Sequence, residues 1–170
     1  MGNNLKGWAG ERWLDTRSAN VRKVMQVRLD VAVSKGCNGV EPDNVDGYTT
    51  ANNSGFALTA ATQLDYNCFL ASEAHARGLT IALKNDVDQL PNLVDDFDFA
   101  VNEQCHAFTE CDGYQVFTSK NKPVFNAEHD DKYKIAATRK TLCEDARKHN
   151  LRTLILPLAL DGSFRYSCEP

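Results

Sequence analysis

Short apolar segments that end at an acidic or amide residue recur along the chain. They occupy residues 12–17, 36–44, 79–86, 97–103, 122–128 and 151–161. The first five end in Asp15, Asp43, Asp86, Glu103 and Glu128. Near-continuous apolar runs of this length are typical of parallel strands that are buried on both faces. We therefore predict strands at 12–17, 36–41, 79–83, 97–101, 123–126 and 151–156.

Helical spacing of apolar residues fills several intervals between these strands. The longest such stretches are 18–35, 59–77 and 131–150. Ser18 is a candidate N-cap of the first helix, and Gly36 and Gly78 follow the first two. A shorter helix or turn at 87–95 contains Pro91. Alternation of strands and helices predicts a parallel sheet, because parallel neighbours need crossover connections.

The carboxylates at the strand ends favour an α/β barrel of the TIM type. Such a barrel gathers the C-terminal ends of its strands around one mouth, where its chemistry takes place. The predicted strands are about two fewer than the eight of a closed barrel, and 170 residues is less than the usual length of roughly 200 or more. The first strand is predicted as early as residue 12. We therefore expect one domain over 1–170, a parallel (β/α) barrel with about six of its eight units that lacks its N-terminal part.

Composition and charge narrow the class of protein. Apolar residues make up 42% of the chain and charged residues 25%, which is typical of one globular domain. The net charge is −4 and no basic stripe is visible, so we expect no nucleic-acid partner. No apolar run approaches the roughly 20 residues of a membrane span, so we expect no membrane partner. The N-terminal residues lack the basic start and apolar core of a signal peptide.

Six cysteines are many for a cytosolic protein of this size. None lies in a CxxC motif, so we favour disulfides over a zinc ribbon, and disulfides indicate an oxidising compartment. Cys37, in a predicted strand, and Cys68, in a predicted helix, are interpreted as free core thiols.

The other four cysteines suggest two bonds. Cys105 and Cys111 can close a short loop after a strand. A bond between Cys143 and Cys168 would fix the C-terminal tail. Four cysteines allow three pairings, so the sequence leaves the pairing open.

The densest group of polar side chains follows the second predicted strand. Within eight residues, the sequence brings together Glu41, Asp43, Asn44, Asp46 and Tyr48. This group predicts a sugar or metal site. The alternative is an acidic surface loop, because Asp, Asn and Gly also suit turns. The Gly-Val pair of the strand just before the group favours a site.

Two further strand ends carry carboxylates of interest. Asn102 and Glu103 end the fourth predicted strand, where apolar walls would raise the pKa of a Glu and suit it to acid catalysis. The alternative is a solvated Glu. Asp43 would face Glu103 across the barrel mouth, which favours function. Glu128, with His129 beside it, is interpreted as a residue that binds substrate or stabilises charge at the mouth.

Three other positions support the site or contribute to it. Trp13 is either a core residue or a stacking face for a sugar. Asp15 and Arg17 form an ion pair that orients the first strand, or bind substrate. Lys84 could be a Schiff-base nucleophile, but we favour a role in balancing the surrounding carboxylates.

These residues lie in motifs that resemble glycoside hydrolase family 114. The motifs are GVEPDNVDGY, GFALTAATQLDYNCFLASEAHARGLTIALKND, FDFAVNEQC and KPVFNAE, and the resemblance runs from about Gly7 to the C-terminal region. It implies a secreted endo-α-1,4-polygalactosaminidase with a (β/α)8 barrel. By position, Asp43 matches the proposed catalytic aspartate and Glu103 the proposed catalytic glutamate. Cys105 and Cys111 match a pair that is common in the family.

The resemblance also implies a set of residues that line or support the cleft. They are Trp13, Asp15, Glu41, Asn44, Asp46, Lys84, Asn85, Asn102 and Glu128. His129 stands where many relatives carry Tyr. Relatives have two further strands upstream of the position where this chain begins, which agrees with the strand count.

Chemistry and resemblance together predict a carboxylate-pair glycosidase. Glu103 would protonate the leaving oxygen, and Asp43 would attack the anomeric carbon or stabilise its charge. The carboxylates at the mouth suit a cationic amino-sugar polymer. We expect no cofactor or metal, and a monomer. One alternative is a Mg²⁺ enzyme that uses the strand-end carboxylates with Lys84 as base. Another is a truncated fragment that binds polysaccharide without turnover.

Overall fold

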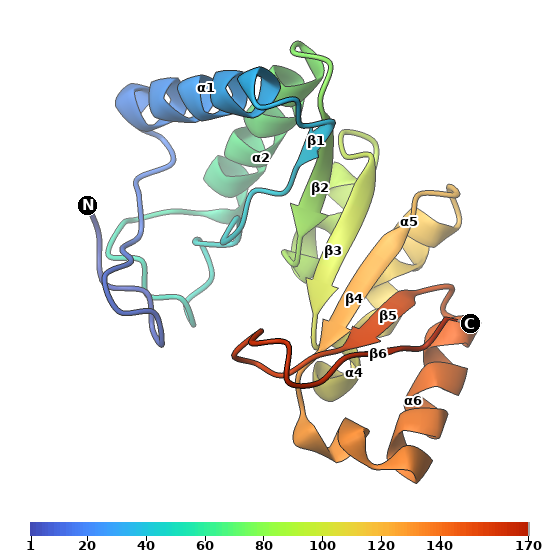
Figure 1. The fold of residues 1–170 in the computed structure, drawn as a ribbon. Helices are drawn as coiled ribbons and strands as arrows, with labels where there is room; N and C mark the ends of the chain where they lie inside the picture. The colour runs from blue at the N-terminus through green and yellow to red at the C-terminus, as the bar shows by residue number, and fades with distance from the viewer. Residues whose placement is uncertain (170) are drawn as a thin grey trace. The chain divides into compact units, whose positions relative to one another are not determined.

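The computed structural model describes residues 1–169, which divide into two compact units (Figure 1). Unit 1 comprises Met1–Phe97, and unit 2 begins at Asp98. Both contain parallel strands with helices between them, so the predicted α/β class is confirmed. Barrel closure and the single domain stay predictions. No helix within the described residues is long and apolar enough to span a membrane.

Unit 1 contains two long helices and a pair of parallel strands. Its elements are α1 (Ala19–Ser34), β1 (Gly39–Val40), α2 (Ala60–His75), β2 (Thr80–Lys84), η1 (Val87–Gln89) and α3 (Leu90–Leu93). β1 pairs with β2 in the register Gly39↔Thr80. β2 is buried from its second residue onward, as expected for a parallel strand. A capping box between Thr59 and Thr62 begins α2, which packs against both α1 and β2.

The strand predicted at 12–17 is wrong. Arg12 forms an isolated antiparallel bridge with Asn4, and the Trp13 N–H donates to the Asn3 carbonyl at 3.0 Å. The apolar stretch here consists of Trp13 and Leu14 between two charged residues, which is too short for a buried parallel strand.

Two other expectations about unit 1 and unit 2 need correction. Cys37 precedes β1 and is exposed, so it is not a core thiol.

The helix predicted at 131–150 is divided at Ile135 into η3 (Asp131–Lys134) and α6 (Ala136–Lys148). Ile135 has an extended backbone, which interrupts the helical hydrogen-bond ladder.

Unit 2 is a four-stranded arrangement with helices along one side (Figure 1). Its strands are β3 (Phe99–Glu103), β4 (Val124–Glu128), β5 (Arg152–Ile155) and β6 (Tyr166–Ser167). Its short helices are α4 (Cys105–Phe108), η2 (Cys111–Tyr114) and α5 (Gln115–Thr118), which precede η3 and α6. β3, β4 and β5 are parallel, whereas β6 is antiparallel to β5. α4 packs on β4 and α6 on β5.

Two disulfides stabilise unit 2. Cys105 is bonded to Cys111 across a sequence separation of 6, and Cys143 to Cys168 across 25. Both pairs are those suggested by the sequence. The second bond joins α6 to the residue after β6, and it lies in a core cluster with Tyr133, Leu142 and Ile155.

Candidate active site

The loop that follows β1 presents carboxylates at a groove of unit 1. The groove encloses about 720 Å³, and the residues lining it include Trp13, Glu41, Asp43, Asn44 and Val45. The structure thus brings together four of the predicted site residues. The Asp43 side chain is 60% exposed, as a residue that contacts a substrate must be.

Lys84 holds two of these carboxylates. It ends β2 in a buried position, and its Nζ lies 3.0 Å from Asp43 Oδ1 and 3.3 Å from Glu41 Oε1. A buried ammonium needs opposite charges nearby to compensate for lost hydration. These contacts support the interpretation of Lys84 as a residue that balances charge.

Trp13 and Asp15 lie in supporting positions. Trp13 is 7% exposed and packs against Gly47, where an added Cβ would lie 3.0 Å from its ring. The ring therefore supports the loop, and only a small part of it is open to the groove that it lines. Asp15 forms a bidentate ion pair with Arg17 at 2.8 and 2.9 Å, and this pairing lowers the pKa of Asp15. Arg17 also donates to the Ala57 carbonyl, so the pair anchors this segment.

A second carboxylate cluster, formed by Asp46 and Asp86, lies beside the loop that follows β1. Asp86 is 3% exposed, and its burial, followed by the charge of Asp46, raises its pKa to about 7. Burial also raises the pKa of Asp46 itself, and it raises that of the Tyr48 phenol. Asp86 and Asn85 both have a positive φ of 50°, a conformation that Asp and Asn tolerate better than most residues.

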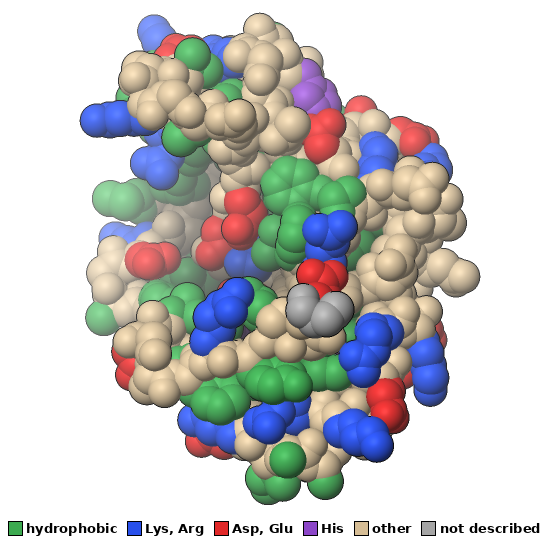
Figure 2. Space-filling view, turned by 45° about the vertical axis from the view of Figure 1, so that its right-hand side comes forward, with side chains coloured by type: hydrophobic (Ala, Val, Ile, Leu, Met, Phe, Trp, Pro, Cys, Tyr) green, Lys and Arg blue, Asp and Glu red, His purple; other side chains and the backbone are tan. Residues whose placement is uncertain are grey.

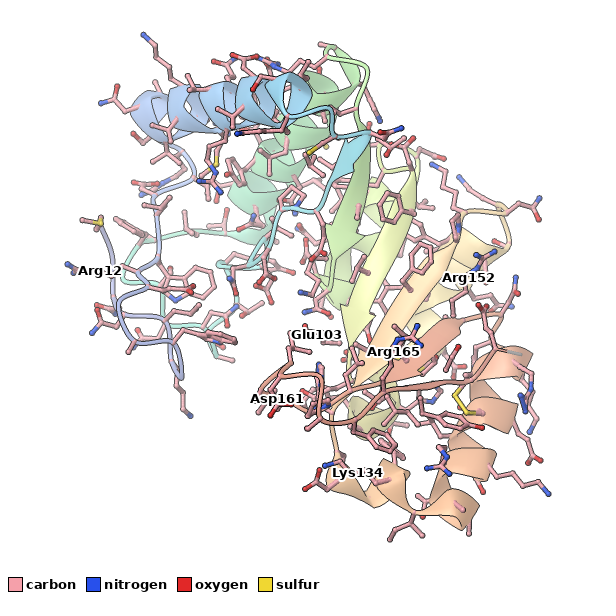
Figure 3. All side chains as sticks on the ribbon, in the orientation of Figure 1. Arg12, Glu103, Lys134, Arg152, Asp161 and Arg165 are labelled. Carbon is pink, nitrogen blue, oxygen red and sulfur yellow. A yellow bond between two sulfur atoms is a disulfide. The ribbon has the colours of Figure 1, made fainter. Side chains whose placement is uncertain are left out.

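In unit 2, Glu103 lies at the C-terminal end of β3 (Figure 3). Its side chain is 42% exposed, so the apolar enclosure expected around it is absent. The buried ring of His129 lies beside it, with Nε2 3.9 Å from Glu103 Oε1. His129 Nδ1 is 3.2 Å from the Leu156 carbonyl, which only accepts hydrogen bonds. That contact places a proton on Nδ1 and leaves Nε2 facing the carboxylate.

Asn102 and Glu128 do not reach the surface, in contrast to their predicted role in substrate binding. Both are fully buried. Asn102 donates to the Tyr114 hydroxyl at 2.8 Å and accepts from Asn126 at 3.0 Å. Glu128 Oε1 accepts from the backbone N–H of His106 at 2.9 Å. Both side chains therefore hold the segment that follows Glu103.

The register of the strands explains this outcome. Glu103 aligns with Ala127, and Asn102 aligns with Asn126. Successive side chains of a strand point to opposite faces, so Glu128 lies on the same face as Asn126 and opposite to Glu103. Counting alternate positions along each predicted strand would have assigned Glu103 and Glu128 to opposite faces of the sheet from the sequence alone.

Replacing Glu128 with Gln is expected to make stability less dependent on pH. Burial raises the pKa of Glu128, and its Oε2 has no hydrogen-bond partner among residues 1–169. A carboxyl with a raised pKa stabilises the fold below its ordinary pKa near 4.5, and this contribution is lost as pH rises through the folded-state pKa. E128Q should therefore melt at the wild-type temperature at pH 4 and higher at pH 7. An E128Q-to-wild-type difference that is constant with pH would contradict this, and E144Q on the exposed side of α6 is the control.

The face of unit 2 that carries Glu103 also has a cavity of about 360 Å³. Its lining includes Val101, Phe125, Arg152, Arg165 and Glu169. Figure 2 shows apolar side chains exposed beside basic and acidic ones on this face. The Arg152 guanidinium lies 5.7 Å from the Phe125 ring centre.

Within residues 1–169, one group has the spacing of metal ligands, namely Cys105, His106 and Cys111. Its two sulfur atoms are joined in a disulfide, so they are not thiolate ligands. The group is therefore a disulfide with a neighbouring histidine.

Two residues near the candidate site were not predicted from the sequence. Asp86 was identified as a strand end but not as a site residue, and Asn67 was not assigned to the site. The KND sequence at the end of β2 was the available signal for Asp86. Asn67 lies in the middle of α2, where one polar residue among apolar ones carries no signal of its own.

Comparisons with known proteins identify the family of the chain and its fold. The model of glycoside-hydrolase family GH114 matches residues 1–169. The crystal structure of Aspergillus fumigatus Ega3 in complex with galactosamine is 41% identical, with a TM-score of 0.90, and the match covers 99% of this chain and 68% of that chain. The glycoside hydrolase domain of PelA from Pseudomonas aeruginosa has the same fold at 14% identity and a TM-score of 0.62, covering 95% and 70%. No curated protein sequence matched.

The family match extends over nearly the whole chain, and the identity to Ega3 is well above the level at which only the fold is shared. The protein is therefore a glycosidase, and the chain belongs to glycoside hydrolase family GH114.

Proposed function

We propose that the protein hydrolyses α-1,4-linked galactosamine-rich polysaccharide as an endo-acting glycosidase. The observation that carries this proposal is the 41% identity to Ega3, whose structure contains galactosamine. The carboxylates agree with it, because a deacetylated amino sugar is a cation. Glu41 and Asp43 line the groove of unit 1, where they would attract such a chain.

Asp43 is proposed as the nucleophile, or as the group that stabilises positive charge on the anomeric carbon. Both roles need an ionised and accessible carboxylate. The Asp43 side chain is exposed, and the Lys84 ammonium lies 3.0 Å from its Oδ1. The Asn44 N–H also donates to Asp43 Oδ1 at 3.0 Å, which fixes the orientation of the carboxylate.

Glu103 is proposed as the general acid and base. It would give its proton to the glycosidic oxygen as the bond from that oxygen to C1 breaks. Water would then attack C1 and return a proton to Glu103 if the mechanism is retaining. A carboxylate separation of about 5–5.5 Å would give retention, and about 6.5–9.5 Å would give inversion.

The test is release of reducing ends from a purified α-1,4-galactosamine polymer. We expect release from this polymer and much less from chitosan, a β-linked glucosamine polymer of similar charge. EDTA should leave the rate unchanged, since the proposed mechanism needs two carboxylates and no metal. Binding of the polymer without release would contradict the proposal and favour a binding role, and loss of activity in EDTA would favour the Mg²⁺ alternative.

Secretion and a monomeric state also stay proposals. Two disulfides support an oxidising compartment, because such bonds are rare in proteins of the cytosol.

A further inference from the structure

A buried chain of polar side chains lies behind the loop that carries Asp43. Gln63 Nε2 donates to Asn67 Oδ1 at 3.0 Å. Asn67 Nδ2 then donates both to the Val45 carbonyl at 3.1 Å and to Asp86 Oδ2 at 2.9 Å. Gln63 and Asn67 are fully buried and Asp86 is 3% exposed. α2 is thus connected to the loop and to the end of β2 by one network.

The network determines the orientation of Asn67 completely. A side-chain amide has two N–H donors, and here one binds the loop backbone and the other the Asp86 carboxyl. The amide oxygen is occupied by Gln63. Without Asp86, one buried donor of Asn67 would lose its acceptor, and a buried donor without a partner is costly. The amide would then turn, and its bond to Val45 would weaken.

The same loop is held at a second point. Lys84, at the end of β2, holds Asp43, while Asn67 holds Val45 from α2. The loop has no helix or strand of its own between residues 41 and 48, so its course depends on these side-chain bonds, on the Trp13 ring and on the bond from Asn52 to the Asp46 carbonyl.

We propose that Asp86 is a positioning residue for Asp43, and that it acts through Asn67, which holds Val45, to fix the loop that carries Asp43. The role of Asp43 in this statement rests on the proposed function. The position of the loop does not, so it can be measured separately.

Protonation of Asp86 belongs to this role. The titratable groups that act on it are Asp46 and Tyr48 from the loop and Asp88 from η1, and Lys84 lies two residues before it. Its pKa is raised to about 7. Above this pH the buried site gains a negative charge that repels Asp46 on the loop. Asn at position 86 imitates the neutral form, which avoids this repulsion and still offers an acceptor to Asn67 Nδ2.

The experiment compares D86N, N67A and D86A with the surface control C37S, because Cys37 is exposed, is not in a disulfide and lies outside the network. Hydrogen exchange of the peptide covering residues 43–48 is measured by mass spectrometry, together with kcat and KM on the galactosamine polymer. D86A also places Ala in a left-handed conformation, so N67A provides the same loss of the Val45 bond without that strain.

We expect N67A and D86A to raise exchange in 43–48 and to lower kcat by about 10- to 100-fold, with a smaller change in KM. D86N should recover most of the loss. The ratio of kcat in D86N to kcat in wild type should rise between pH 6 and 8, because only the wild type gains the charge.

Exchange and kcat in N67A and D86A equal to those in C37S would overturn the proposal, as would a D86N variant as impaired as D86A. If no variant and no wild-type protein releases reducing ends, the proposed function fails, while increased exchange in N67A and D86A would still establish the positioning of the loop.

Discussion

Replacing Glu103 with Gln is expected to lower kcat on the galactosamine polymer by about 10²- to 10⁴-fold, the contribution typical of general acid–base catalysis. Gln has the shape of Glu but can neither donate a carboxylic proton to the glycosidic oxygen nor accept one from water. Because the Glu103 side chain is 42% exposed, the change should leave the melting temperature unaltered. Reducing-end assays with wild type, E103Q and the surface control E144Q measure this effect directly.

A substrate with a better leaving group makes the E103Q test specific for proton transfer. An aryl glycoside has a good leaving group that needs little protonation, so E103Q should lose less activity on it than on the polymer. Equal losses on both substrates would contradict the role of general acid, and wild-type activity of E103Q on the polymer would exclude Glu103 from catalysis. The comparison therefore separates proton transfer from substrate binding.

Removal of the Cys143–Cys168 disulfide is expected to cost about 3 kcal/mol of unfolding free energy. The bond closes a loop with a sequence separation of 25 and connects α6 to the residue after β6. β6 has two residues, so its backbone pairing with β5 is too short to hold the C-terminal segment alone. The double replacement of both cysteines by Ser should lower the urea midpoint accordingly.

Cys37 provides a matched control for this experiment. It is a free and exposed cysteine of unit 1, so Cys37→Ser should leave the midpoint unchanged. Equal midpoints for the double variant and C37S would show that the disulfide is not needed to hold the segment.

The sequence predicted those elements whose apolar pattern is contained in one short segment of the chain. β2, β3, β4 and β5 are near-continuous apolar runs, and each lies within about two residues of its predicted position. The strand expected at 12–17 failed because two apolar residues between charges cannot supply a buried strand. β6 was not predicted, because its pairing depends on a disulfide to a residue of α6.

Only the part of the candidate site that is contiguous in the sequence was predicted, for a related reason. Asp43, Glu41 and Asn44 are adjacent in sequence, so their common location at one groove could be inferred from the loop alone. The bond between Asn67 and Asp86 joins residues 19 apart, from the middle of a helix to a strand end. Such a contact depends on how α2 packs on β2, which hydrophobic periodicity does not specify.

The alternation along β3 and β4 has a consequence for the evolvability of this enzyme. Glu103 shares its face with Val101, Phe125 and Ala127, whereas the buried network of Asn102, Asn126 and Glu128 occupies the opposite face. With Glu103 in its proposed role, substitutions on the first face would change substrate recognition without breaking the hydrogen bonds of the second. Substrate preference and thermodynamic stability would then be encoded at alternating positions of the same two strands, so each could diverge while the other is preserved.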